Sequence, residues 1–234
     1  MKPHVTCLML SSLDGRLGSG RSGEGAKDEI AARGKAFEDA HDELGGDGWI
    51  IGRVTGAEMS KALAHPPANF EAPPRPFHFA RRDAAAYGII VDPRGKLHFE
   101  KADIGGDHVV VLLAGGVEDA HLAELKADGA SYVVAEGPEI DLRATLELLA
   151  RELGVKRLLL EGGGGVNGEF LKAGVVDDVV LLIWPSIVGL SGERTVFESG
   201  AHSLADTVGL KLRSCEAKGE VVRLHYDVTP KTTG

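Results

Sequence analysis

The sequence predicts an α/β fold with one mixed, mostly parallel sheet, helices on both of its faces and an antiparallel hairpin at the C-terminal end. Short apolar runs typical of buried strands alternate with helical patterns over most of the chain. The last two strand-like runs, 210–216 and 221–228, flank a Lys218-Gly219 turn, which favours antiparallel pairing. We expect a single domain, 1–234, in which the proline-rich connector 65–76 excludes regular structure.

The individual elements follow from apolar periodicity and from glycine or proline stops. Before the hairpin, strands are expected over 4–10, 49–51, 77–80, 89–91, 109–113, 132–135, 158–160 and 179–183. Helices are expected over 28–44, 55–63, 120–126 and 142–153, and from 166 to a glycine cap at Gly174. The alternation of these elements is what predicts the α/β class.

Composition excludes several classes of function. The net charge of −9 argues against a nucleic-acid partner. No apolar run approaches the roughly 18 residues that a membrane helix needs, and the N-terminus lacks a signal-peptide cleavage site. Cys7 and Cys215 both fall in expected strands, and we predict buried free thiols, which suit a reducing cytoplasm. No cysteine and histidine cluster has zinc spacing, so no metal site is predicted.

A strand, a glycine loop and a helix follow one another over residues 158–174. Within the loop, Gly163, Gly165 and Gly168 match the pattern G-x-G-x-x-G. Glycines allow close backbone approach, and a helix N-terminus favours an anion, so the loop indicates a phosphate site. The alternative is a tight turn without a ligand. A Rossmann site fits poorly, because the next strand ends in Trp184-Pro185 without a ribose-binding carboxylate, and the lysine of a P-loop is missing.

Two other strand ends carry arginines that suit a phosphate. Gly52 allows a ligand to approach the backbone closely, Arg53 offers a guanidinium, and Thr55 offers a hydroxyl and a helix N-cap. Arg94 follows strand 89–91, where an arginine can hold a ribose 2′-phosphate, and Arg81-Arg82 compete for this role. The alternative is that Thr55 only caps its helix and that the arginines are solvated.

The carboxylates of Asp14 and Glu161 are the candidate catalytic groups, because each comes just after a strand, where α/β sheets bind ligands. Glu161 lies between a buried strand and a glycine, so its burial is costly unless it is hydrogen-bonded or binds a ligand. A pyrimidine or pterin ring presents N–H donors that a carboxylate accepts. The alternatives are a turn for Asp14 and a helix-dipole contact or salt bridge for Glu161. Scattered histidines are assigned to surface or packing: His41, His65, His78 and His98.

Four segments together resemble the reductase domain of the bifunctional riboflavin-biosynthesis deaminase/reductase, within the dihydrofolate-reductase-like superfamily. They are VTCLMLSSLDGRLG, IIGRVT, IIVDPRGKL and LLLEGGGGVNGEFLKAGVVDDVVLLIWPSIVG, in the family's order from residue 5 to about 189. The resemblance implies a dihydrofolate-reductase-like three-layer fold and an NADPH-dependent reductase. It implies 5-amino-6-(5-phosphoribosylamino)uracil or a related pyrimidine as substrate. The family often dimerises through its sheet, so we expect a homodimer.

The resemblance also implies roles for individual residues. Glu161 would face the substrate. The residues expected to bind NADPH, by resemblance or by the arguments above, are Ser11, Gly52, Arg53, Thr55, Arg94, Gly163, Gly164, Gly165, Val166, Asn167 and Gly168. The chain departs from the family at Leu8, often a lysine, at Pro93, often a serine, and at 56–60, in place of A-D-D-P. These departures leave open a reductase paralogue acting on a pterin or other carbonyl substrate, or a non-catalytic nucleotide-binding module.

Overall fold

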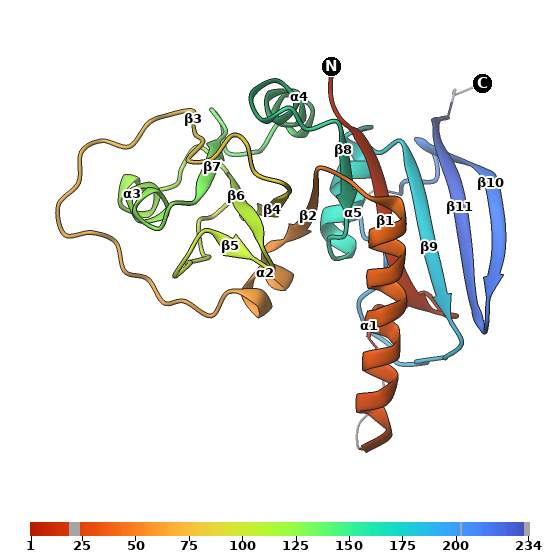
Figure 1. Ribbon diagram of the computed structural model, residues 1–234. Helices are drawn as coiled ribbons and strands as arrows, with labels where there is room; N and C mark the ends of the chain where they lie inside the picture. The colour runs from red at the N-terminus through yellow and green to blue at the C-terminus, as the bar shows by residue number, and fades with distance from the viewer. Residues whose placement is uncertain (19–23, 202, 232–234) are drawn as a thin grey trace. The chain divides into compact units, whose positions relative to one another are not determined.

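The computed structural model describes residues 1–18, 24–201 and 203–231. The chain forms two compact units (Figure 1). Unit 1 comprises Met1–Pro3 and Gly46–Leu158, and unit 2 comprises His4–Gly45 and Leu159–Gly234. Within the described ranges, none of the helices combines the length and the apolar character needed to span a membrane.

Unit 1 is built on a parallel core of hydrogen-bonded strands. The strands β2 (Gly48–Gly52), β4 (Tyr87–Val91), β6 (Asp107–Leu113) and β7 (Ser131–Val134) pair in parallel in this order. Two short strands pair antiparallel: β3 (Phe77–His78) with β7, and β5 (Asp103–Ile104) with β6. The parallel strands are almost entirely buried, which explains their continuous runs of valine, isoleucine and leucine.

Three helices belong to unit 1: α2 (Arg53–Met59), α3 (Asp119–Ala127) and α4 (Leu142–Leu153). Helix α4 has the bounds that the sequence predicts, because both of its ends carry strong signals. The Asp141 side chain accepts a hydrogen bond from the Ala144 N–H, and Gly154 ends the helix at φ 71°. Residues 60–76 run in a wide arc around α3 (Figure 1), and the Tyr132 hydroxyl donates to the Pro74 carbonyl at 3.0 Å.

Unit 2 combines one parallel and two antiparallel strand pairs. Strand β1 (His4–Ser12) pairs in parallel with β9 (Asp178–Trp184), β9 pairs antiparallel with β11 (Val221–Pro230), and β11 pairs antiparallel with β10 (Val208–Lys218). Gly219, at φ 63°, makes the hairpin turn. The unit also contains helices α1 (Glu24–Leu44) and α5 (Gly164–Lys172), and β8 (Arg157–Leu160) spans the division between the units.

Helix α1 packs along the strands of unit 2 (Figure 1). Leu8 and Leu10 of β1 and Val180 and Leu182 of β9 form a buried cluster with Ala40 of the helix. Further residues packed against this cluster are Ala36, Phe37, Leu44, Trp184 and Val221. The helical spacing of the apolar side chains therefore turns one stripe of α1 toward the sheet.

The predicted fold class is confirmed: an α/β fold with a mixed, mostly parallel sheet and a C-terminal antiparallel pair of strands. The expected single domain stays a prediction. Strand β5 was not anticipated, and the strand expected over 77–80 is shorter. Helix α2 begins at Arg53 with Gly52 as its N-cap, so the prediction that Thr55 caps this helix is wrong.

The two cysteines differ in burial. Both thiols are free, and Cys7 is buried as predicted, with burial raising its pKa. Cys215 is exposed, so the prediction of burial is wrong for this residue. It lies on β10, which pairs only with β11 among the described strands and is exposed along most of its length.

Candidate active site

The carboxylate of Glu161 follows β8 and is nearly buried, with 10% of the side chain exposed. Its Oε1 lies 2.7 Å from Nδ1 of His41, near the end of α1. Burial raises the pKa of Glu161, and the hydrogen bond from His41 opposes this rise. A carboxyl group in this state can accept N–H groups of a ligand or exchange a proton with it.

His41 is the functional candidate that the sequence analysis missed. It was assigned to surface or packing, yet the fold brings it to a residue 120 positions away. A signal was present: His41 lies one helical turn from Phe37 and Leu44, which both pack against the buried cluster. The stripe that carries it therefore faces the sheet.

The glycines of the loop after β8 differ in how much space lies beside them. A Cβ atom on Gly164 would lie 2.3 Å from the Thr195 carbonyl oxygen, and one on Gly168 would lie within 2 Å of the Glu198 carbonyl oxygen. The segment 195–198 is held there by two hydrogen bonds of 2.9 Å, from the Glu198 N–H to the Gly164 carbonyl and from Asn167 Nδ2 to the Val196 carbonyl. These glycines are thus required by the chain's own packing.

Two other loop glycines, Gly163 and Gly165, have open space beside them. A Cβ on Gly163 or Gly165 would meet nothing within 4 Å. Gly163 is the N-cap of α5, and Gly165 is exposed in its first turn. Val166 is half-buried, whereas Asn167 is fully buried. The positions that leave room for a ligand are therefore Gly163 and Gly165.

The carboxylate of Asp14 already has three hydrogen-bond donors from the chain. It accepts hydrogen bonds from the Ser12 hydroxyl at 2.6 Å, the Gly189 N–H at 2.9 Å and the Val188 N–H at 3.0 Å. These bonds lower its pKa, because all of them favour the charged form. Ser11 is buried, and its hydroxyl donates to the Ser12 carbonyl at 3.0 Å. Asp14 thus ties the loop after β9 to the end of β1.

In unit 1, Gly52, Arg53 and Thr55 lie at the start of α2. Arg53 is exposed, and Thr55 is half-buried in the first turn. Arg82, one competitor for a phosphate role, is engaged with Glu152 at 2.6 Å and lies over the Phe79 ring. This engagement leaves Arg94 as the better candidate of the two.

Arg94 lines an open cleft of about 1090 Å³ in unit 1. The cleft lies at the carboxyl ends of β4, β6 and β7, the usual place for ligands of α/β sheets. Lys96 adds a second cation, and Gly115-Gly116 line the cleft before α3. The sequence analysis missed this glycine pair, although a strand, Ala114-Gly115-Gly116 and a helix follow one another. A Cβ on Gly115 would lie 2.7 Å from the Ala135 carbonyl oxygen, so close packing of two strand ends requires glycine there.

The fold and these groups define an α/β protein whose glycine turns, cations and buried carboxylate lie where sheet strands end. The chain belongs to the RibD C-terminal domain family, whose model matches residues 3–224. The family predicted from the four sequence segments is thereby confirmed.

Two relatives carry the same name, 2,5-diamino-6-ribosylamino-4(3H)-pyrimidinone 5′-phosphate reductase. The protein from Methanothermobacter thermautotrophicus is 38% identical over 108 residues, which cover 46% of this chain and 49% of the relative. The protein from Aquifex aeolicus is 33% identical over 111 residues, 47% of this chain and 49% of the relative. The match thus spans about half the length of each curated relative.

Solved structures share the fold. A pyrimidine reductase-like protein from Corynebacterium diphtheriae superposes with a TM-score of 0.65 at 15% identity, covering 97% of this chain and 92% of that one. The riboflavin biosynthesis reductase Rib7 of Saccharomyces cerevisiae gives 0.61 at 18% identity, covering 97% and 90%. RibD of Acinetobacter baumannii gives 0.60 at 19% identity, covering 97% and 58%.

Proposed function

We propose that the protein is an NADPH-dependent reductase of a phosphorylated pyrimidine in riboflavin biosynthesis. The substrate that we favour is 5-amino-6-(5-phosphoribosylamino)uracil or a related pyrimidine, because the named relatives are reductases of a pyrimidinone 5′-phosphate. The observation that carries the proposal is the buried carboxylate of Glu161, which has a raised pKa and follows directly after a sheet strand.

In this proposal Glu161 orients the substrate. A pyrimidine ring presents N–H donors, and an anionic acceptor that is 10% exposed binds them strongly. His41 holds the carboxylate in place through the 2.7 Å contact at Nδ1. NADPH supplies the hydride, and one proton completes the two-electron reduction of ribosyl to ribityl. The chain contributes orientation and a dry setting for the reacting carbon.

Each unit, taken by itself, carries residues proposed to hold phosphate groups of NADPH. In unit 1 they are Gly52, Arg53, Thr55 and Arg94, and in unit 2 they are Gly163 and Gly165, the loop positions with open space beside them. For Ser11, Gly164, Val166, Asn167 and Gly168, NADPH binding stays a prediction from the sequence. Exposed cations and open glycines suit phosphate groups. Arg94 and Lys96, which line the same cleft, support a preference for NADPH over NADH, because the two cofactors differ by one phosphate.

We assign the substrate role to Glu161 and not to Asp14. The Asp14 carboxylate already accepts three hydrogen bonds from the chain, so few of its lone pairs remain for a substrate. Its proposed part is to hold the loop after β9. A catalytic role for Asp14 stays a prediction that the substitution described in the Discussion tests.

A substrate panel tests the proposed activity. Purified protein is mixed with NADPH and, separately, with the phosphorylated pyrimidine, its unphosphorylated form, a dihydropterin and simple carbonyl compounds, and loss of the reduced-nicotinamide absorbance is followed. We expect turnover with the phosphorylated pyrimidine and slower turnover with NADH. Turnover with the pterin or a carbonyl compound alone would identify a paralogue, and tight NADPH binding without any turnover would identify a non-catalytic module.

We also propose that the protein is a cytoplasmic homodimer. Both cysteines are free, which suits a reducing compartment. Leu210 and Leu212 on β10 are 54% and 52% exposed, and an apolar strand surface of this kind suits a protein partner. Light scattering should give the mass of two chains at micromolar concentration for the wild type and of one chain for Leu212→Lys. A monomeric wild type would disprove the dimer.

A further inference from the structure

The imidazole of His121 in α3 is buried without a hydrogen bond. Only 8% of the residue is exposed, and neither ring nitrogen has a hydrogen-bond partner among the described residues. Leaving a buried polar group without a hydrogen bond destabilises the folded state. The chain even makes room for this ring, because a Cβ on Gly95 would lie 2.7 Å from its Cδ2 atom. A buried imidazole that is accommodated but unpaired calls for a ligand.

Two other metal-ligating side chains surround this imidazole. Glu124 lies one turn further along α3, on the same face, and its side chain is only 1% exposed. His98, on the segment after β4, places Nδ1 at 2.7 Å from Oε1 of Glu124. The rings of His98 and His121 stand edge to face with centroids 5.3 Å apart. One potential ligand atom from each residue lies within 4.8 Å of the other two.

We propose that His98, His121 and Glu124 bind a divalent transition-metal ion, with Zn²⁺ as the ion that the set fits best. Two imidazole nitrogens and one carboxylate oxygen are a ligand set that zinc sites use, and three protein ligands leave one coordination position open. The metal would give one of the two unpaired ring nitrogens of His121 a partner. His98 and His121 also line the cleft of unit 1, so water or a small anion can reach the open position.

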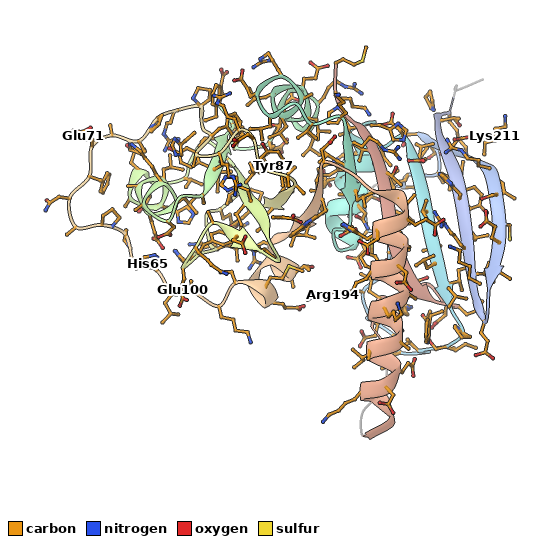
Figure 2. All side chains as sticks on the ribbon, in the orientation of Figure 1. His65, Glu71, Tyr87, Glu100, Arg194 and Lys211 are labelled. Atoms are coloured by element: carbon orange, nitrogen blue, oxygen red, sulfur yellow. The ribbon has the colours of Figure 1, made fainter. Side chains whose placement is uncertain are left out.

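An overlapping set, His65, Glu124 and Asp128, is less suited to hold the ion. His65, labelled in Figure 2, is exposed on the 60–76 segment, and both of its ring nitrogens are engaged. Its Nδ1 lies 2.7 Å from the Leu63 carbonyl, and its Nε2 lies 3.0 Å from Oδ1 of Asp128. Its backbone N–H donates to Oε1 of Glu124 at 3.2 Å, so His65 would orient a ligand and not serve as one.

Metal binding should therefore stabilise unit 1. The ion would connect α3 with the segment after β4, while Glu124 keeps its contact with the 60–76 segment. An ion that binds only the folded state raises the midpoint of thermal unfolding. This inference does not depend on the reductase activity, and none of the three ligands belongs to the residues proposed for NADPH or substrate.

Metal titrations of the full chain test the site. After treatment with a chelator, the protein is titrated with ZnCl₂ by calorimetry and with CoCl₂ by visible spectroscopy, and thermal unfolding is measured with and without Zn²⁺. The variants are His121→Leu and Glu124→Gln, with His65→Ala for the overlapping set. His78→Gln is the control, since His78 is a half-buried histidine of the same unit outside both sets.

We expect one Zn²⁺ per chain in the wild type and the control, with the intense visible bands of low-coordinate Co²⁺. His121→Leu and Glu124→Gln should each weaken Zn²⁺ binding by at least about 100-fold, beyond the roughly 10–100-fold that loss of an orienting partner costs. His65→Ala should stay within that smaller range. His121→Leu replaces an unpaired buried imidazole by an apolar group, so it should fold at least as well without metal.

Three results would overturn the proposal. The first is a wild type that binds Zn²⁺ no more tightly than His121→Leu, including the case of no binding. The second is a loss in His65→Ala as large as that in His121→Leu, which would assign the ion to the other set. The third is a Zn²⁺-dependent rise in unfolding temperature that persists in both ligand variants. Should His121→Leu fail to fold, the nearly isosteric Glu124→Gln decides whether Glu124 binds the ion, and a loss in His65→Ala as large as that in Glu124→Gln would assign the ion to the other set.

Discussion

The ends of β1 and β8 in unit 2 both present a carboxylate, yet the two carboxylates are in opposite states. Asp14 is exposed, accepts three hydrogen bonds from the chain and has a lowered pKa. Glu161 is nearly buried, contacts His41 at 2.7 Å and has a raised pKa. Both carboxylates come just after a strand, yet Asp14 holds a loop in place whereas Glu161 is suited to bind a ligand.

The difference arises from the hydrogen-bond donors that surround each carboxylate. The loop after β9 offers the N–H groups of Val188 and Gly189 to Asp14. The loop after β8 consists of glycines whose backbone turns into α5, and Glu161 is left with a side-chain partner from α1. The Ser12 hydroxyl and the two backbone N–H groups favour the ionised form of Asp14, whereas burial disfavours the ionised form of Glu161 and His41 opposes this only in part. A carboxylate's role therefore depends on its donors more than on its place in the sheet.

The largest effect is expected for Glu161→Gln. The substitution keeps the shape and removes the charge that accepts substrate N–H groups. It should lower kcat/KM by an amount that corresponds to about 2–4 kcal/mol of lost transition-state stabilisation. This figure follows from the strength of charge-assisted hydrogen bonds and the cost of an unmatched group. Steady-state kinetics with the phosphorylated pyrimidine measures this loss. An unchanged kcat/KM would show that the substrate site has been placed wrongly.

The next largest effect is expected for substitutions of two neighbouring glycines in the loop after β8. Gly164→Val puts atoms against the Thr195 carbonyl oxygen and should lower the free energy of unfolding by about 1–3 kcal/mol or more. Gly165→Ala, its neighbour with open space, should fold normally and weaken NADPH binding if the loop meets a phosphate. Denaturant unfolding and an NADPH titration separate the two effects. Equal stability of both variants would mean that segment 195–198 does not pack on this loop.

A smaller effect, visible as a pH shift, is expected for His41→Leu. His41 lowers the pKa of Glu161, so its loss lets burial raise that pKa further. Glu161 must be ionised to accept N–H groups, so the acidic limb of the kcat/KM profile should move to higher pH. Glu161→Gln should lack this limb. A profile identical to that of the wild type would show that His41 does not set the ionisation of Glu161.

The smallest effect on turnover is expected for Asp14→Asn, which should change kcat/KM less than about threefold because Asp14 touches no reacting atom in this account. The substitution should instead loosen the 187–189 loop. The pKa of Asp14 is lower in the folded protein than in the unfolded chain. The ionised carboxylate therefore stabilises the fold at pH values above its unfolded pKa near 3.9, and this contribution is lost as the pH falls through its folded pKa. Limited proteolysis of the loop measures the loosening. A collapse of kcat/KM with an intact loop would restore Asp14 as a catalytic group.

Elements with strong local signals were predictable from the sequence. Helix α4 was predicted with its observed bounds, since Asp141 and Gly154 mark its ends. The hairpin and the buried strands followed from Gly219 and from continuous apolar runs. Helix α2 was misplaced because the signal of Thr55 as a cap was weaker than the backbone turn at Gly52.

What the sequence could not predict are contacts between residues distant in the chain. Glu161 was recognised as a buried carboxylate that needs a partner, but the apolar stripe of α1 indicates only that His41 faces the sheet, not that it meets Glu161, 120 residues later. Gly164 and Gly168 were interpreted as ligand positions, although segment 195–198 occupies the space beside them. His98, His121 and Glu124 lack metal-site spacing along the chain, and only the fold brings them together.

The most direct test of the account is an NADPH titration of Glu161→Gln, with Gly165→Ala as the matched comparison, in the absence of substrate. If Glu161 serves the substrate, Glu161→Gln should bind NADPH within about threefold of the wild type while its kcat/KM falls, and Gly165→Ala should bind NADPH more weakly. Weak NADPH binding by Glu161→Gln, with normal turnover at saturating cofactor, would contradict the account and assign this carboxylate to the cofactor loop.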